Sequence, residues 1–287
     1  MPDSKPHAHS SHARNESGQL VRQVELVERD AWLDFFAAAP DETKQSLRLS
    51  HEVIEGIGLL SCPAIPIVEL NRGMVAAVDH LPSSSAVMHA LEWLRSRAAP
   101  GWAMQVAPLS DGKARAIPGL GNLIECGGWT KFAQRLLPGM NWSPATDAHV
   151  SEVKDASASS FGSLVQGGFG LPEECATWFG ALVGRPGWHC FEATVENEPA
   201  GAAAMFVSGT AAWCGMSATL PSFRGRGVQT GLIAARLEAA SRLGVSIATC
   251  ETGNPPSSNA EGYSSYRNQK RAGFTELFIR TNLKASC

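Results

Sequence analysis

Apolar residues recur along this chain in strand-like runs and helix-like stripes, with one interruption near the middle. Residues 1–18 hold Ser, His, Pro, Asn and charged residues without apolar periodicity, which predicts a disordered tail. The periodic pattern then begins, and it predicts a short strand at 21–26 followed by a helix that contains Trp32 and Phe35. A cluster of Pro, Gly and Asn at 137–148 interrupts the pattern and indicates a linker.

The two regions on either side of this linker share a series of landmarks. An apolar strand with a Gly-Met pair, an amphipathic helix, a glycine, a short strand and a Gly-aromatic-Thr triplet recur in the same order, about 140 to 145 residues apart. The matched residues are Gly73-Met74 with Gly215-Met216, the stripe Val87, Leu91, Leu94, Ala98 with Val228, Leu232, Ala235, Ala239, then Gly101 with Gly244, and Gly128-Trp129-Thr130 with Gly273-Phe274-Thr275. We therefore predict a tandem duplication of one α/β unit, with domains over 19–140 and 145–287.

The two copies differ between the strand and the helix. The first copy has DHLPSS at 79–84, whereas the second has PSFRGRG at 221–227. Glycines allow a sharp turn and a close approach of the backbone to a ligand. The first N–H groups of the following helix are unpaired donors at the positive end of its dipole, which favours a pyrophosphate group. The alternative is an ordinary solvated arginine turn.

In this context the second copy resembles the GNAT acyltransferase superfamily, whose mark is a strand, a turn of the form R/Q-x-x-G-x-G/A and a helix that begins on the acyl-CoA pyrophosphate. Arg224 and Gly227 match this turn, whereas Gln229 replaces its final Gly or Ala. A second landmark, a short helix that ends in a basic residue, any residue and Gly-Phe, is found at 265–274. The resemblance covers about 147–284.

Through the internal repeat, the resemblance extends to 20–137 as a degenerate copy without the turn. It implies an α/β fold with two tandem GNAT-like domains, each a mostly antiparallel twisted sheet flanked by helices. The domain over 145–287 would be the catalytic one.

The resemblance also implies where acetyl-CoA would bind. The end of the strand before the turn would pair with the pantetheine arm and direct one N–H at the thioester carbonyl. The backbone of the turn would hold the pyrophosphate, and the last helix would contact the pantetheine or the phosphates. The implied contact residues are Ala218, Thr219, Leu220, Arg224, Gly225, Arg226, Gly227, Val228, Gln229, Thr230, Ser265, Asn268 and Gln269.

The acid that would protonate the departing thiolate is displaced in this chain. Many members of the superfamily have a tyrosine four residues before the final glycine, and that position is Gln269 here. Only two tyrosines occur, Tyr263 and Tyr266. We take Tyr266 as the candidate acid, with packing or substrate contact as the alternative.

The candidate general base is Glu251, at the end of the strand that is expected to splay away from the one before the turn. A base helps because an amine with a pKa of about 10.4 is almost fully protonated at neutral pH. Glu251 could instead pair with Arg267 or Arg271. Glu192 and His189 are further candidate bases.

The charge and the composition of the chain limit the kinds of partner and the compartment that we expect. The formal charge of −3 gives no strong attraction to nucleic acid, and no run of apolar residues is long enough to span a membrane. The seven cysteines are scattered without a C-x-x-C pair, which is typical of reduced thiols and indicates no zinc site. The N-terminus lacks the apolar region of a secretory signal, so we predict a cytoplasmic protein.

These patterns together predict an acetyl-CoA-dependent N-acetyltransferase that acts on the amine of a small molecule by direct attack within a ternary complex. The alternatives are transfer of a longer acyl group, acetylation of a protein amine, or a non-catalytic CoA-binding sensor. Direct transfer needs no acyl-enzyme, so Cys214 and Cys250 are expected to be packed thiols. We expect a monomer or homodimer.

Overall fold

The computed structural model describes residues 7–76, 81–108, 117, 119–255 and 263–286. Its strands form a single sheet in the order β1-β2-β3-β4-β11-β5-β10-β9-β8-β7-β6. The strands are β1 (Ser50–Ile54), β2 (Ile57–Ser61), β3 (Arg72–Val75), β4 (Ala103–Val106), β5 (Ile124–Arg135), β6 (His149–Glu152), β7 (Trp188–Val195), β8 (Glu198–Ser208), β9 (Ala211–Thr219), β10 (Ile247–Gly253) and β11 (Thr275–Lys284).

Helices connect and cover these strands. They are α1 (His7–Ala38), α2 (Asp41–Leu47), α3 (Ser84–Arg97), α4 (Ala158–Phe169), α5 (Glu174–Gly180), α6 (Val228–Arg242) and α7 (Ser264–Arg271), with short 3₁₀ turns η1 (Val68–Leu70), η3 (Asp155–Ser157) and η4 (Pro221–Phe223). No helix among these described residues is long and apolar enough to cross a membrane.

The N-terminal predictions are wrong where the structure describes them. The strand predicted at 21–26 lies inside α1, and the tail predicted over 1–18 is helical from His7 onward. The residues that favour the helix are apolar and recur at steps of three or four, the spacing of one helix face. They are Leu20, Val24, Val27, Ala31 and Phe35.

The predicted repeat is visible in the topology. In the first half, β3 and β4 are parallel neighbours joined through α3, and in the second half β9 and β10 are parallel neighbours joined through α6. Each pair is followed in the sheet by two long antiparallel strands. The segment between β5 and β6, at 136–148, has neither helix nor strand, as the predicted linker requires.

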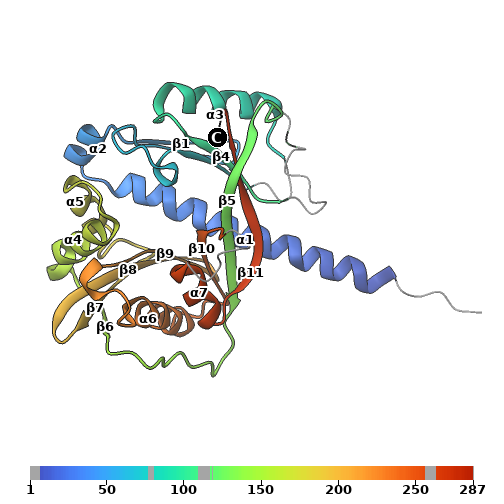
Figure 1. Ribbon diagram of the computed structural model, residues 1–287. Helices are drawn as coiled ribbons and strands as arrows, with labels where there is room; N and C mark the ends of the chain where they lie inside the picture. Colours follow the sequence, from blue (N-terminus) through green and yellow to red (C-terminus); the bar gives the residue numbers. More distant parts are fainter. Residues whose placement is uncertain (1–6, 77–80, 109–116, 118, 256–262, 287) are drawn as a thin grey trace, which may run out of the picture.

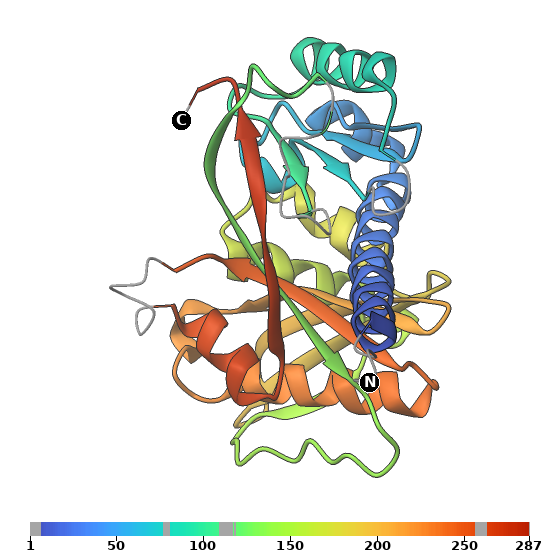
Figure 2. The same ribbon diagram turned by 90° about the vertical axis from the view of Figure 1, so that its right-hand side faces the viewer.

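The two halves exchange a strand, which the sequence patterns did not predict. β11 belongs to the second half, yet it lies between β4 and β5 of the first half. In turn β5 lies between β10 and β11 of the second half. Figure 2 shows these two strands side by side along much of the molecule. The halves therefore share one continuous sheet instead of having one sheet each.

Helix α1 lies between the halves (Figure 1). It contacts β2 of the first half and β9 of the second. Its Phe35 stacks on Trp178 of α5 with ring centroids 4.1 Å apart, and the Trp178 indole donates to the Phe35 carbonyl at 2.7 Å. Fully burying such a side chain stabilises a fold by about 1.5 to 3 kcal/mol. The helix thus belongs to the core of both halves.

The cysteines are mostly as predicted. Five of them, Cys62, Cys175, Cys190, Cys214 and Cys250, are buried free thiols. Cys126 differs from the expectation, because it is disulfide-bonded.

Candidate functional site

The parallel strands β9 and β10 separate partway along their length. Their pairing runs only from Ile247 opposite Ala211 to Thr249 opposite Trp213, although β9 continues to Thr219 and β10 to Gly253. Beyond this point β9 stays paired with β8, and β10 stays paired with β5. A gap therefore opens between two strands of the same sheet, as the sequence predicted.

A β-bulge lies in β9 at this gap. Gly215 pairs with Ala204 and Ala218 pairs with Ala202, so two residues of β9 face one residue of β8. One of them, Met216, has a φ of 49°, a left-handed conformation that costs about 1 to 3 kcal/mol for a residue other than glycine. Such bulges redirect side chains and backbone groups, here at the mouth of the gap.

The glycine-rich turn between β9 and α6 has an open helix start. Gly225 and Gly227 have φ values of 81° and 77°, which favour glycine. A Cβ atom at Gly227 would also overlap the hydroxyl of Thr146 in the preceding linker. No side chain caps α6, and within the described part of the chain the N–H groups of residues 228–230 have no partner. The turn thus offers a compact set of free donors.

Gln229 links this turn to α7. Its amide nitrogen donates to the Ser265 hydroxyl at 3.1 Å, and its oxygen accepts from the Asn268 amide at 2.7 Å. The residue that departs from the superfamily turn therefore ties the helix after the turn to the last helix.

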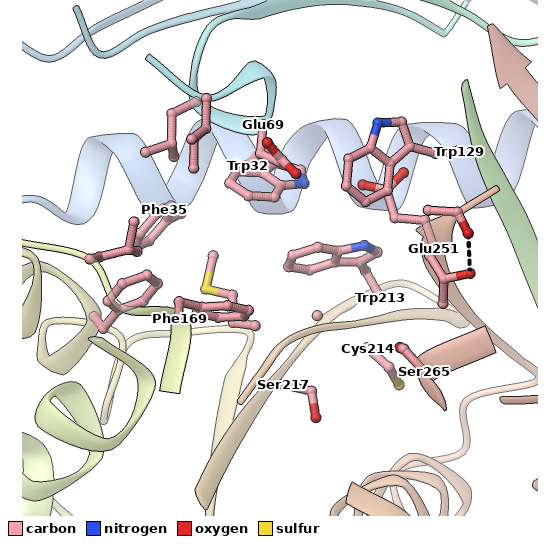
Figure 3. A pocket seen from close by; sticks show the side chains of 18 of the residues that line it. Trp32, Phe35, Glu69, Trp129, Phe169, Trp213, Cys214, Ser217, Glu251 and Ser265 are labelled. Carbon is pink, nitrogen blue, oxygen red and sulfur yellow. Dashed lines mark hydrogen bonds between the residues drawn. The ribbon is translucent and has the colours of Figure 1, made fainter. Parts of the chain in front are cut away.

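A cavity of about 430 Å³ lies between α1 and the gap (Figure 3), and its lining includes Gln229 at the start of α6. Trp32 and Phe35 of α1 form one side, and Trp213 and Ser217 of β9 lie opposite. The lining consists of Trp32, Phe35, Ile67, Glu69, Leu70, Trp129, Phe169, Leu171, Phe179, Trp213, Cys214, Gly215, Met216, Ser217, Gln229, Glu251, Thr252, Gly253, Ser265 and Gln269. Its volume lies within the range of small-molecule sites.

Several buried polar atoms of the lining have no hydrogen-bond partner within the described chain. They are Trp32 Nε1, Trp213 Nε1, Ser217 Oγ and Gln269 Oε1. Burying an unpaired polar group is costly, so such atoms are rare in folded proteins unless a ligand or water pairs with them. Their concentration in one cavity indicates a site for a ligand with polar groups of its own.

Glu251 belongs to a buried ion network that joins both halves. Its carboxylate contacts Arg280 of β11 at 2.9 Å and Arg72 of β3 at 3.4 Å. Both arginines also pair with Glu28 of α1, at 2.5 and 3.7 Å, and Glu28 contacts Lys131 of β5. With Glu25, which pairs with Arg280 and Lys131, the network holds three carboxylates and three cations.

The pKa values of Glu28 and Glu251 are shifted in opposite directions. Burial opposes ionisation of Glu28, but Arg280, Lys131 and Arg72 outweigh it and hold its pKa well below the usual range. At Glu251, burial is the largest effect and the negative charge of Glu28 adds to it. Together they raise the pKa of Glu251 to about 7 against Arg280, Arg72 and Lys131. A carboxylate with this pKa is suited to proton transfer near neutral pH.

The structure brings most of the predicted contact residues together. The turn residues Arg224, Gly225, Arg226, Gly227 and Val228 lead into α6, where Gln229 and Thr230 follow. Ser265 and Gln269 line the cavity, and Asn268 is held by Gln229. Ala218, Thr219, Leu220 and the turn residues 224–228 lie outside the cavity lining, whose β9 residues are 213–217, so their contact with acetyl-CoA stays a prediction.

Tyr266 does not reach the cavity. Its hydroxyl donates to Glu276 at 2.5 Å on the exposed side of α7, and this bond raises the pKa of Tyr266. Ser265 and Gln269 line the cavity instead, because they lie on another side of the helix. We therefore do not retain Tyr266 as the acid.

The other candidate bases also lie elsewhere. His189 bonds Glu152 at 2.7 Å on the surface, and Glu192 is not part of the lining. Glu251 itself pairs with Arg72 and Arg280, not with Arg267 or Arg271 as the alternative held.

The sequence patterns missed the contribution of the first half. Glu25, Glu28, Trp32 and Phe35 follow one another at steps of three, four and three, so they share one face of α1 that runs from the ion network to the cavity. Two carboxylates on the apolar side of a helix were a signal for buried ion pairs. Lys131 and Arg280, each inside an apolar strand, were the matching signal.

Comparison with solved structures places this fold among acetyltransferases. The GCN5-related N-acetyltransferase from Kribbella flavida matches 91% of this chain over 94% of its own length, with a TM-score of 0.55 and 15% identity. The GCN5-related N-acetyltransferase from Sphaerobacter thermophilus matches 70% of this chain over 66% of its own length, with a TM-score of 0.52 and 18% identity.

A functionally unknown conserved protein from Staphylococcus epidermidis matches 86% of this chain over 98% of its own length, with a TM-score of 0.50 and 9% identity. No protein-family model matches the sequence, and no curated protein does. At such identities the likeness concerns the fold alone. The match to the Kribbella protein spans both halves, and the chain therefore has the α/β fold of the GNAT acetyltransferases.

Proposed function

We propose that the protein is an acetyl-CoA-dependent N-acetyltransferase that acts on a small-molecule amine by direct attack within a ternary complex. One observation carries this proposal: a single cavity joins the open start of α6, at Gln229, to a buried carboxylate with a raised pKa, Glu251. The GNAT fold supports the same conclusion.

The residues of the turn fit the acyl donor. The free N–H groups at the start of α6 suit a pyrophosphate, and Gly227 keeps the backbone there clear of side chain. Among the described residues, the edge of β9 beyond Trp213 has no strand partner on the side of β10, which suits an extended arm. When bound, acetyl-CoA would supply the acetyl group as a reactive thioester.

Glu251 would take the proton of the amine. A primary amine with a pKa of about 10.4 reaches the cavity as an ammonium and must lose a proton before its nitrogen can form the new C–N bond. Glu251, ionised above about pH 7, accepts that proton and returns it to solvent. As the C–N bond forms, the nitrogen loses a second proton, the C–S bond breaks and the sulfur leaves as a thiolate. The thiolate takes up one proton, so the whole reaction yields the acetylated amine, a thiol and one proton released to solvent.

A strong acid is not required for this scheme. Thiols have reference pKa values of about 8.5, so a thiolate is a tolerable leaving group. Gln269, at the position where many superfamily members have tyrosine, lines the cavity and offers an amide instead.

A non-catalytic CoA-binding protein is the second candidate. The ion pairs of Glu251 with Arg72 and Arg280 favour it, because they give this carboxylate a structural role. Thiol release from acetyl-CoA in the presence of amines separates the two, since a binding protein gives none.

The proposal predicts that the activity depends on pH through the ionisation of Glu251. Activity should rise with pH through about 7, because only the ionised carboxylate accepts a proton. Glu251→Gln should lower kcat/KM by about 10²- to 10⁴-fold and flatten this limb while acetyl-CoA still binds. Glu276→Gln, which alters an exposed carboxylate outside the cavity, is the control. An unchanged rate in Glu251→Gln would exclude the base role.

A further inference from the structure

The acceptor end of the cavity has aromatic walls. Six of the twenty lining residues are aromatic: Trp32, Phe35, Trp129, Phe169, Phe179 and Trp213. Trp32 of the first half packs directly on Trp213 of the second, with ring centroids 5.5 Å apart and the rings tilted by 56°, so the two indoles form one wall. The guanidinium of Arg72 lies 4.5 Å from the Trp32 ring centroid, so this indole is held in place by a cation–π contact. The walls suit a flat apolar group.

The charge of the lining has one sign. Glu69 and Glu251 are its acidic members, and no Lys or Arg is among the described residues that line the cavity. Aromatic faces also attract cations through their quadrupole. A ligand with an ammonium group matches the aromatic faces and the carboxylate of Glu69, whereas Glu251 is already paired with Arg72 and Arg280.

Two indole N–H groups of the cavity lining have no hydrogen-bond acceptor among the described residues. Trp32 Nε1 and Trp213 Nε1 are buried and have no partner within the described residues. In Figure 3 both indole nitrogens lie on the side of their rings toward Trp129 and Glu251. A ligand without an oxygen at this place would leave them unpaired, which sites of this kind disfavour strongly.

The opening of the cavity is apolar as well. Phe169 is 50% exposed and Ile67 is 37% exposed, and both are lining residues. Together with the aromatic walls they favour a ligand with an apolar body over one that carries hydroxyl or ammonium groups on every side.

We propose that the acceptor is a small primary monoamine whose body is an aromatic ring with an oxygen substituent, held against the wall that Trp32 of the first half and Trp213 of the second form together. This proposal rests on the proposed function and names its substrate class. The half without the cofactor turn thus determines specificity, because Trp32, Phe35, Ile67, Glu69, Leu70 and Trp129 all come from it.

The first test is amine binding to the full chain by calorimetry, without acyl donor. The probes are tyramine, 2-phenylethylamine, butylamine, glucosamine and spermidine. Tyramine and 2-phenylethylamine should bind at least about tenfold more tightly than butylamine, since only they bury a ring. Tyramine should exceed 2-phenylethylamine, because its oxygen pairs with the indoles. Equal or tighter binding of glucosamine or spermidine would overturn the proposal.

The second test removes the indole N–H groups and keeps a ring. Trp32→Phe and Trp213→Phe should each reduce the preference for tyramine over 2-phenylethylamine and leave acetyl-CoA binding intact. Trp93→Phe is the matched control, because Trp93 is buried in α3 against another core. A preference for tyramine that survives both cavity substitutions would contradict the assignment, and melting curves show whether each variant is folded.

Thiol release with acetyl-CoA and the same amines then separates the two proposals. Release with the ring amines supports both. Release only with amines lacking a ring, or only with a lysine-containing peptide, overturns the acceptor class and leaves N-acetyl transfer standing. Binding of tyramine without any release overturns the proposed function and leaves the aromatic site standing.

Discussion

The corresponding helices of the two halves, α3 and α6, begin in different ways. In the first half, the Ser83 hydroxyl accepts from the Ala86 N–H at 3.1 Å and caps α3, while Glu55 holds Ser83 in place. In the second half, α6 begins at Gly227 without a side-chain cap. One half satisfies its helix start with its own serine, and in the other half the corresponding donors have no partner among the described residues.

The paired strands differ in the same sense. β3 and β4 are paired over all four residues of each strand, whereas β9 and β10 pair over three residues and then separate. The closed pair gives a rigid framework, and the open pair gives a cavity. The same pair of parallel strands is therefore closed in one half and open in the other.

The closed half still takes part in the site, through α1 and the ion network. The largest effect is expected from removing the ion pairs between the halves at Glu28, which contacts Lys131, Arg280 and Arg72. Glu28→Gln should lower the free energy of unfolding by about 3 to 5 kcal/mol, because it leaves buried cations without their carboxylate.

Denaturant unfolding followed by near-UV circular dichroism measures this loss. Both halves should still unfold in one transition, since they share the sheet. Glu52→Gln on β1, where the carboxylate is exposed, should change stability by less than about 0.5 kcal/mol. Similar stabilities of the Glu28 and Glu52 variants would show that the network does not hold the halves together.

A smaller effect sharpens the difference between the helix starts. Ser83→Ala removes the cap of α3 and should reduce the free energy of unfolding by about 1 kcal/mol. The affinity for acetyl-CoA, measured by calorimetry, should stay the same, because this helix start serves only the fold. A weaker affinity of this variant for acetyl-CoA would contradict the placement of the acetyl-CoA site in the second half.

The sequence carried enough information for the repeat, the turn and Glu251. Local signals encode all three: glycines with φ values of 81° and 77° in the turn, helix stripes at constant spacing, and an acidic residue at a strand end. Such features depend on near neighbours in the chain, so they can be predicted from pattern alone.

Local patterns could not predict two features of the structure. One is the exchange of β5 and β11 between the halves, and the other is the aromatic lining of the cavity. Strand order in a sheet depends on pairings between residues far apart in the chain, such as Ile279 with Thr130. Likewise Trp32 meets Trp213 only because α1 packs between the halves. Tyr266 shows the limit at short range, because it lies on another side of α7 from Gln269: Tyr266 bonds Glu276, whereas Gln269 lines the cavity.

The measurement that tests the central claim most directly is the stoichiometry of acetyl-CoA binding by titration calorimetry. One molecule should bind per chain. Gly227→Ala should weaken binding by at least about tenfold, because a Cβ there is strained and meets Thr146. Gly244→Ala, with the same φ of 77° and open space around it, should bind normally. Two sites per chain, or unchanged binding in Gly227→Ala, would contradict the account.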